Sequence, residues 1–146
     1  MNYKNLKNVI FRLVLIVPFL LAFDKPMYIY DDGSVEKGWM FFVFGWLSLF
    51  DGNFAWFANI PFLIAFVMLN RQSIFVVLSA AAAFFLGLTI FDYHNMGSID
   101  SNKSEHLIIG LAAYLWFSTI LMVFLISVIN FLHIRKFNNM NYHGSP

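Results

Sequence analysis

One acidic residue lies deep inside an apolar stretch of this chain. Between Gly38 and Leu69 the single ionisable side chain is Asp51. A carboxylate flanked by long apolar runs could carry a proton or bind a cation if it faced a polar cavity. It could equally have a structural role, because a carboxylate accepts hydrogen bonds from the first N–H groups of a helix. The Gly-Asn pair that follows Asp51 is typical of a helix start, and both roles remain open.

Two amides and an indole follow on the helix that would start there. Asn53, Trp56 and Asn59 fall within an arc of about 120° around a helix. An amide inside lipid must find a hydrogen-bond partner, so this arc should face protein or water. Pro61 should kink the helix and free a backbone carbonyl one turn earlier. The arc could line a transport pathway with Asp51, or it could join helices to one another.

Other residue patterns give little support to catalysis or metal binding. His94 and His106 share a polar stretch, but their spacing matches no compact zinc motif, so we expect a solvated loop. Nucleophile-elbow, zinc-protease, P-loop and dinucleotide-binding motifs are missing from the sequence. The lack of cysteine excludes disulfides and thiolate sites, and there is no large basic patch for nucleic acid. We therefore expect no enzymatic activity, no cofactor, no bound metal and no nucleic-acid partner.

The composition is typical of a membrane protein. Of the 146 residues, 60% are hydrophobic and 12% are charged. Soluble domains have about 45–50% apolar and about 25% charged residues. The 19 phenylalanines alone provide more apolar surface than a chain of this length can bury in water. Much of that surface should face lipid.

Charge-poor apolar stretches predict an all-α membrane protein with four transmembrane helices. These cover residues 9–23, 52–70, 73–91 and 107–132. The stretch 38–50 is too short for a hydrocarbon core of about 30 Å, so it should form an interfacial or re-entrant helix. One domain is expected over residues 1–136, followed by a flexible cytoplasmic tail at 137–146.

The first apolar stretch has a second interpretation. It follows Lys4 and Lys7, as the apolar part of a secretory signal peptide would. It lacks a small-residue cleavage site, and Arg12 and Pro18 interrupt it, so a retained transmembrane helix is expected. Arg12 could reach the cytoplasmic headgroups, or it could serve as a buried counter-charge.

The charge distribution predicts the orientation in a bacterial inner membrane. With four spans, one side of the membrane collects six Lys or Arg residues and the other side three. The six are Lys4, Lys7, Arg12, Arg71, Arg135 and Lys136, and the three are Lys25, Lys37 and Lys103. The side with fewer basic residues holds seven of the eight acidic residues. Both termini should therefore be cytoplasmic.

Two surfaces are candidates for recognition. Ser79, Ala83 and Gly87 recur every fourth residue, and small residues let helices approach closely, either inside the bundle or between protomers.

The second surface is on the outer side. Trp39 and Trp46 suit the membrane boundary, where they could contact lipid or another membrane protein. Asp31, Asp32 and Glu36 in the outer loop could recognise a basic partner.

The segment Gly45–Asn59, with the sequence GWLSLFDGNFAWFAN, resembles a stretch of small uncharacterised bacterial inner-membrane proteins. The resemblance covers about a tenth of the chain. It implies a small polytopic membrane protein and adds no particular activity.

The function expected from these patterns is non-catalytic interaction, of an accessory, immunity or defence type. The partners would be the lipid bilayer and another membrane protein, or a second copy of this chain in a homo-oligomer. The alternative is a small oligomeric transporter or channel lined by Asp51, Asn53 and Asn59. A membrane-embedded enzyme has the least support.

Overall fold

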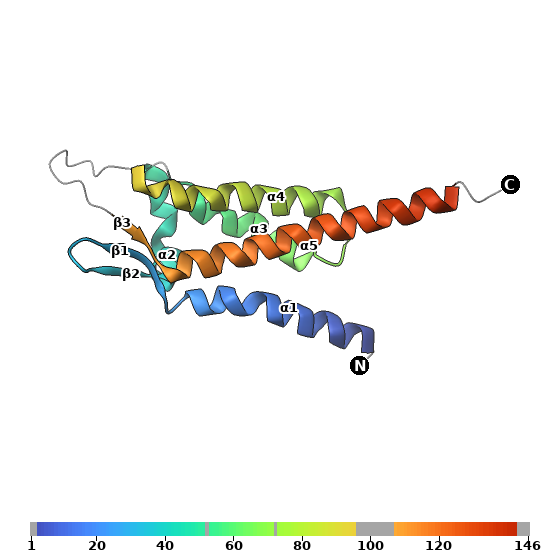
Figure 1. Cartoon of the computed structure of the whole chain (residues 1–146), viewed down its shortest axis with the longest axis horizontal. Coiled ribbons are helices and arrows are strands. Elements are labelled where there is room, and N and C mark those ends of the chain that lie inside the picture. Colours follow the sequence, from blue (N-terminus) through green and yellow to red (C-terminus); the bar gives the residue numbers. More distant parts are fainter. Residues whose placement is uncertain (1–2, 52, 72, 96–106, 143–146) are drawn as a thin grey trace.

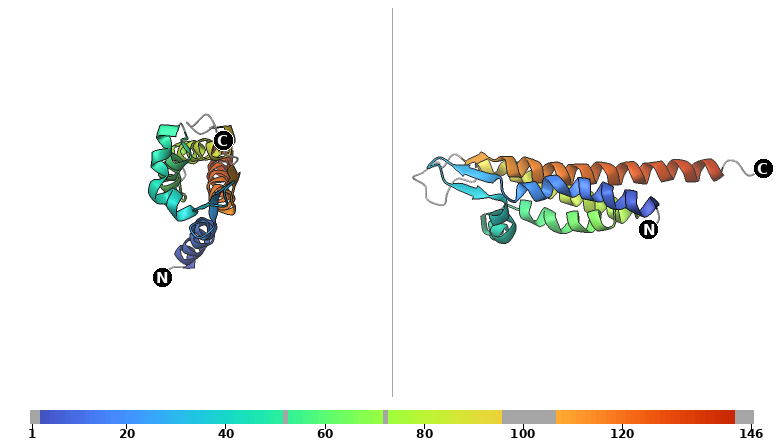
Figure 2. Two further views of the ribbon diagram at one scale, coloured as in Figure 1. Left: turned by 90° about the vertical axis from the view of Figure 1, so that its left-hand side faces the viewer. Right: turned by 90° about the horizontal axis from the view of Figure 1, so that it is seen from below.

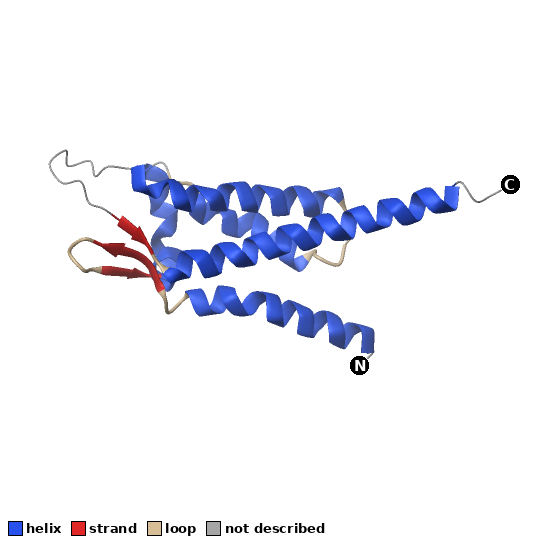
Figure 3. Cartoon of the chain, in the orientation of Figure 1, coloured by secondary structure: helices blue, strands red, loops and turns tan. Residues whose placement is uncertain are grey.

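The computed structural model describes residues 3–51, 53–71, 73–95 and 107–142. The α-helices are α1 (Tyr3–Ala22), α2 (Gly38–Phe44), α3 (Asn59–Val67), α4 (Ile74–Leu88) and α5 (Leu111–Tyr142). The 3₁₀ helices are η1 (Gly45–Asp51), η2 (Ala55–Ala58) and η3 (Thr89–Asn95). The strands are β1 (Pro26–Tyr30), β2 (Val35–Lys37) and β3 (Leu107–Ile109). The described chain is thus mainly helical with a small sheet (Figure 3).

The helices α1, α3, α4 and α5 run along the long axis of the molecule, and α2 lies across it (Figure 1). The sheet is at the same end as α2, and both chain termini are at the opposite end (Figure 1). The helix α4 packs against α3 and α5, and α1 packs against α5. Seen along the long axis, α1 lies to one side of the other helices (Figure 2).

The helix α5 buries a single stripe of its surface. The stripe recurs every three or four residues, as one face of a helix does, and comprises Ala112, Ala113, Trp116, Thr119, Ile120, Val123 and Ser127. The uncovered face is apolar as well, with Leu125 and Ile129 exposed. In a soluble bundle the uncovered face would be polar. Over Leu111–His133, α5 is therefore apolar beyond the stripe that protein covers.

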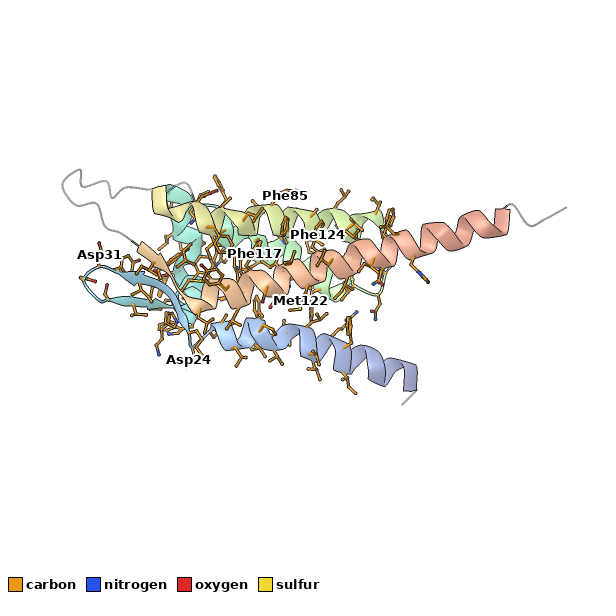
Figure 4. The ribbon with its side chains drawn as sticks, viewed as in Figure 1. Asp24, Asp31, Phe85, Phe117, Met122 and Phe124 are labelled. Carbon is orange, nitrogen blue, oxygen red and sulfur yellow. The ribbon has the colours of Figure 1, made fainter. Side chains whose placement is uncertain are left out.

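Aromatic side chains fill the interface between α4 and α5. The rings of Phe84 and Phe124 are stacked with centroids 5.2 Å apart, and Phe84 also lies 5.5 Å from Phe117. Figure 4 shows Phe117 and Phe124 between the two helices, whereas Phe85 points away from them. Gly87 leaves room for this contact, since a Cβ atom there would lie 3.3 Å from the Phe117 ring.

Two helical stretches of the described chain are long and apolar enough to cross a membrane. These are Ile74–Asp92, with 19 residues, and Leu111–His133, with 23 residues. In both, 28% of the most apolar 18-residue window is buried inside the protein. The core helix of a soluble protein would be mostly buried. The remaining apolar helical stretches, Ile10–Ala22, Gly38–Leu47 and Ala55–Val67, are shorter.

Several predicted helix boundaries are wrong. The expected span 52–70 is helical only from Ala55, and α3 ends at Val67. The first residues of the expected span 107–132 form β3, because a short apolar run can be a strand or a helix and periodicity alone does not separate them. The expected flexible tail is helical as far as Tyr142, since no Gly or Pro stops α5 earlier.

The expectation of an all-α chain is wrong for the stretch 24–37, which was predicted as a loop. It folds into a hairpin in which β1 pairs antiparallel with β2, and β3 joins the other edge of β1 in the order β2-β1-β3. Gly33 N–H donates to the Tyr30 carbonyl (2.9 Å), and Gly33 has a φ of 81°, which glycine adopts without strain. The strand that completes the sheet is distant in sequence, so local patterns did not reveal it.

Candidate functional site

The amide of Asn59 forms a hydrogen-bond network inside the bundle. Its Oδ1 atom accepts a hydrogen bond from Trp116 Nε1 on α5 (2.9 Å), and its Nδ2 atom donates to the Trp56 carbonyl (2.8 Å). Trp116 is completely buried and Asn59 is 5% exposed. Both ends of the amide are therefore used, and the Oδ1 end joins α3 to α5.

Trp56 extends this network to the crosswise helix. Its Nε1 atom donates to the Phe42 carbonyl of α2 (2.9 Å). The indole also lies against the backbone where η1 begins, because a Cβ atom at Gly45 would be 2.7 Å from Trp56 Cδ1. Trp56 thus links α2 and η1 to the helical stretch Ala55–Val67, which comprises η2 and α3 and is called the α3 arm below.

Asn53 caps the next helical turn. It is buried, and its Oδ1 atom accepts a hydrogen bond from Ala55 N–H (2.8 Å) at the start of η2. The chain is not helical at Asn53 and Phe54, so the interruption predicted beside Asp51 is present. The Asp51 side chain lies outside the described part of the structure, and its role stays a prediction.

The sequence grouped Asn53, Trp56 and Asn59, and the structure adds Trp116 as the partner of Asn59. A buried indole N–H needs a hydrogen-bond acceptor, so the sequence could have predicted that Trp116 would bind one. An isolated tryptophan in a long apolar run gave no indication of which acceptor it would find. The resulting arrangement suits the joining of helices, because the polar atoms of Asn59 bond to protein groups.

Arg12 joins α1 to the end of α3. Its Nη2 atom donates to the carbonyl of Val67 (3.2 Å), the last residue of α3. The last carbonyls of a helix lack intrahelical partners and carry partial negative charge, so a cation is favourable there. This cap differs from both sequence-based roles for Arg12, the headgroup contact and the buried counter-charge.

The small residues of α4 pack within one chain. Ser79, Ala83 and Gly87 are all buried, and Gly87 faces Phe117 and Ile120 of α5. Close packing of this stripe is therefore satisfied inside the bundle.

The hairpin presents acidic side chains at the sheet end. Asp31 and Asp32 are exposed in the turn, and Asp32 Oδ1 accepts a hydrogen bond from Ser34 N–H (2.8 Å). Figure 4 shows Asp31 at the hairpin tip. Tyr30 Oη donates to Glu36 Oε2 (3.2 Å). Burial raises the pKa of the Glu36 carboxyl above its ordinary value of 4.5, and the Tyr30 hydrogen bond lowers it by a smaller amount.

Of the remaining candidate residues, the structure describes the side chains of the two tryptophans but not those of the two histidines. Trp39 and Trp46 are exposed on α2 and η1, at 45% and 48% of their surface. His106 and the side chain of His94 lie outside the described residues. Within the described residues, no group of three or more His, Asp or Glu side chains could hold a metal ion.

Comparison with known proteins assigns no family. The chain matches no protein-family model, no curated protein and no solved structure. The resemblance of Gly45–Asn59 to small bacterial inner-membrane proteins therefore remains a prediction.

The Asn59–Trp116 bond can be measured with a double-mutant cycle. We expect Asn59→Leu and Trp116→Phe each to lower the free energy of unfolding by about 1–3 kcal/mol, because each leaves a buried polar group without its partner. The double variant should lose less than the sum, with a coupling of at least about 0.5 kcal/mol. Denaturant titration in detergent gives these values. Asn70→Leu, at an exposed amide, is the control and should have little effect. Additive losses would show that the bond does not stabilise the fold.

Glu36 should make stability depend on pH. A carboxyl with a raised pKa binds its proton more tightly in the folded state, so the folded state is penalised above the raised pKa. The penalty disappears as the pH falls through the raised pKa to the ordinary value of 4.5. We expect Glu36→Gln to be more stable than the parent at pH 7 and to lose this part of the pH dependence.

The Tyr30 hydroxyl provides a matched variant for this measurement. Tyr30→Phe removes the bond that lowers the pKa of Glu36, so the pH-dependent step should move upward. Thermal unfolding of the three proteins between pH 4 and pH 8 tests both statements. Superimposable profiles for the parent and Glu36→Gln would contradict the assignment.

Proposed function

We propose that this chain is a small polytopic membrane protein that acts by binding another protein, without catalysis of its own. Membrane placement is supported by large apolar side chains that are exposed on every lengthwise helix. Examples are Val14 (64%), Val67 (65%), Phe85 (65%) and Ile129 (63%). Soluble proteins do not expose contiguous apolar surface on this scale. Acyl chains would cover it in a bilayer.

The proposed orientation places the sheet outside a bacterial inner membrane. The sheet and the two termini are at opposite ends of the bundle (Figure 1). The hairpin carries Asp31, Asp32 and Glu36, whereas Arg135 and Lys136 follow the apolar part of α5. Basic residues are retained on the cytoplasmic side, so the termini would be cytoplasmic.

The proposed binding function rests on one observation: the base of the acidic hairpin is buried and hydrogen-bonded to the rest of the protein. Met27 and Tyr28 in β1 are 0% and 3% exposed, and Gly110 N–H donates to the Met27 carbonyl (2.8 Å) just before α5 begins. The tip residues Asp31 and Asp32 remain exposed. A surface that is already ordered loses little entropy on binding. Its charge would favour a partner with a basic surface.

The transporter alternative has less support. Its proposed lining included Asn53 and Asn59, whose Oδ1 atoms accept hydrogen bonds from protein groups. Asn59 joins α3 to α5, so it cannot also exchange this bond with a solute unless the bundle opens. The geometry therefore favours interaction over transport.

Cysteine labelling tests the orientation directly, because the chain has no natural cysteine. Ser34→Cys, in the hairpin turn, should react with a membrane-impermeant maleimide in intact spheroplasts. Asn138→Cys should react only after the membrane is permeabilised. Labelling of both variants in intact spheroplasts would show an even number of crossings between residues 34 and 138, which contradicts the three that we propose. The reverse pattern would show the opposite orientation.

Photo-crosslinking tests the acidic hairpin as a binding surface. A photoreactive amino acid replaces Val35, which is exposed beside the acidic tip. We expect a protein adduct whose yield falls several-fold in Asp31→Asn/Asp32→Asn and in high salt, because both weaken attraction to a basic partner. Asparagine at both positions suits the turn and keeps the acceptor for Ser34 N–H.

Arg71→Gln is the matched control, since it removes one charge at the other end of the bundle. Its adduct yield should equal that of the parent at matched expression. A yield that neither salt nor the double substitution changes would contradict recognition by the acidic tip.

A further inference from the structure

The α3 arm is too short to cross a bilayer by itself. It consists of four residues in η2 and nine in α3. At about 1.5 Å per residue this makes about 20 Å, against a hydrocarbon core of about 30 Å. The neighbouring stretch Ile74–Asp92 has 19 residues, or about 28 Å. Beside α4, the α3 arm therefore falls short of the membrane thickness by about 10 Å.

The crosswise segment occupies the place where this length is missing. The helices α2 and η1 together cover Gly38–Asp51, and we name this segment the crosspiece. It lies beyond the start of η2, at the sheet end of the bundle (Figure 2). A helix with its side chains is about 10–12 Å wide. The crosspiece stacked on the α3 arm therefore spans about 30 Å, which equals the hydrocarbon thickness.

The surface of the crosspiece suits hydrocarbon rather than a water boundary. A helix that lies in the interface needs a strongly polar face toward water. The crosspiece has no charged residue before Asp51, and its exposed large apolar side chains are Trp39, Val43, Phe44, Trp46, Leu47, Leu49 and Phe50. Phe50 is the most exposed of these, at 79%. Apolar side chains exposed on this scale are unfavourable in contact with water.

Contacts with α1 fix the crosspiece just below the polar end of the molecule. The Phe42 ring lies 4.8 Å from Phe19 and 4.5 Å from Phe23, measured between centroids. Immediately before the crosspiece, Lys37 Nζ and Asp24 Oδ1 form an exposed ion pair at 3.3 Å. Exposed charges belong in water, so this pair marks the outer boundary, and the crosspiece begins directly beneath it.

We propose that the crosspiece is embedded in the hydrocarbon of the outer leaflet, where acyl chains cover its exposed face. It is then the outer part of the crossing that continues through the α3 arm, and it supplies the thickness that the α3 arm lacks. This inference rests on the proposed membrane placement. One consequence is that the hydrogen bond from Trp56 to the Phe42 carbonyl lies inside the membrane.

Depth measurement with nitroxide labels tests this placement, because single cysteines can be added to a chain that has none. Labels replace Phe50 and Val43 in the crosspiece, Leu125 on the exposed face of α5, and Ser34 in the hairpin turn. The full chain is reconstituted in phosphatidylcholine–phosphatidylglycerol vesicles. Collisions of each label with oxygen, which concentrates in hydrocarbon, and with a water-soluble nickel chelate are compared. We expect Phe50→Cys and Val43→Cys to resemble Leu125→Cys, with high oxygen and low nickel accessibility.

The controls separate failure of this inference from failure of the membrane proposal. Phe50→Cys could be as accessible to nickel as Ser34→Cys while Leu125→Cys stays protected. This outcome would overturn the embedding of the crosspiece but not the membrane placement of the protein. Nickel access at Leu125→Cys would overturn the membrane placement itself. Low accessibility of Phe50→Cys to both reagents would show that protein covers the crosspiece, and it would overturn acyl chains as the occupant.

A second measurement needs no substitution. Lipids brominated along their acyl chains quench tryptophans that they contact. Trp39 and Trp46 are the two tryptophans of the crosspiece and both are exposed, whereas Trp116 is fully buried. We expect acyl-chain bromines to quench the unmodified protein strongly. Quenching by a soluble quencher such as iodide, without quenching by brominated lipid, would overturn the proposal.

Discussion

The hydrogen bond between Asn59 and Trp116 links the short α3 arm to the longest helix. Its donor and acceptor are both buried, and either one alone would be costly to leave without a partner. Asn59 also binds the Trp56 carbonyl, and Trp56 binds the Phe42 carbonyl in turn. The crosspiece, the α3 arm and α5 therefore share one chain of hydrogen bonds. A change in the position of any of them would break a bond that water cannot replace.

Apolar packing supplies the rest of the bundle and needs little sequence specificity. Phenylalanine rings fill the space between α4 and α5, and Phe19 stacks on Phe62 with centroids 5.3 Å apart to join α1 to α3. Gly38 permits a close contact with the Ala22 carbonyl, where the crosspiece passes the end of α1. Backbone approach of this kind excludes any side chain at position 38. The small residues and the rings together bring the helices to their packed distance.

The two ends of the molecule differ in both charge and structure. At the end that holds the termini, the cationic Arg12 side chain caps the last carbonyl of α3. At the sheet end, ordered strands replace what local sequence predicted as a loop, and they hold an acidic tip in place. The proposed interaction with a basic partner agrees with this difference in charge between the two ends. The polar atoms of Asn59 inside the bundle bond to neighbouring helices, so the recognition that we propose would use the end with exposed charge.

The sequence by itself determined the properties that depend on composition and local pattern. It indicated the helical class, the apolar stretches that became α4 and most of α5, and the interruption beside Asp51. Hydrophobic runs and turn residues influence the backbone conformation of neighbouring residues, so these features can be predicted from local sequence. The sequence also singled out Asn53, Trp56 and Asn59 as polar residues of one predicted helix, but in the structure Asn53 precedes the helical turn and bonds to Ala55, whereas Asn59 bonds to Trp56. Only the tertiary structure decided their partners: Trp116 for Asn59, the Phe42 carbonyl for Trp56 and the Val67 carbonyl for Arg12. Tertiary structure likewise decided that residues 107–109 pair with β1 and that the α3 arm stops short. These outcomes depend on contacts between residues distant in sequence, and no local pattern encodes which of several apolar surfaces will meet.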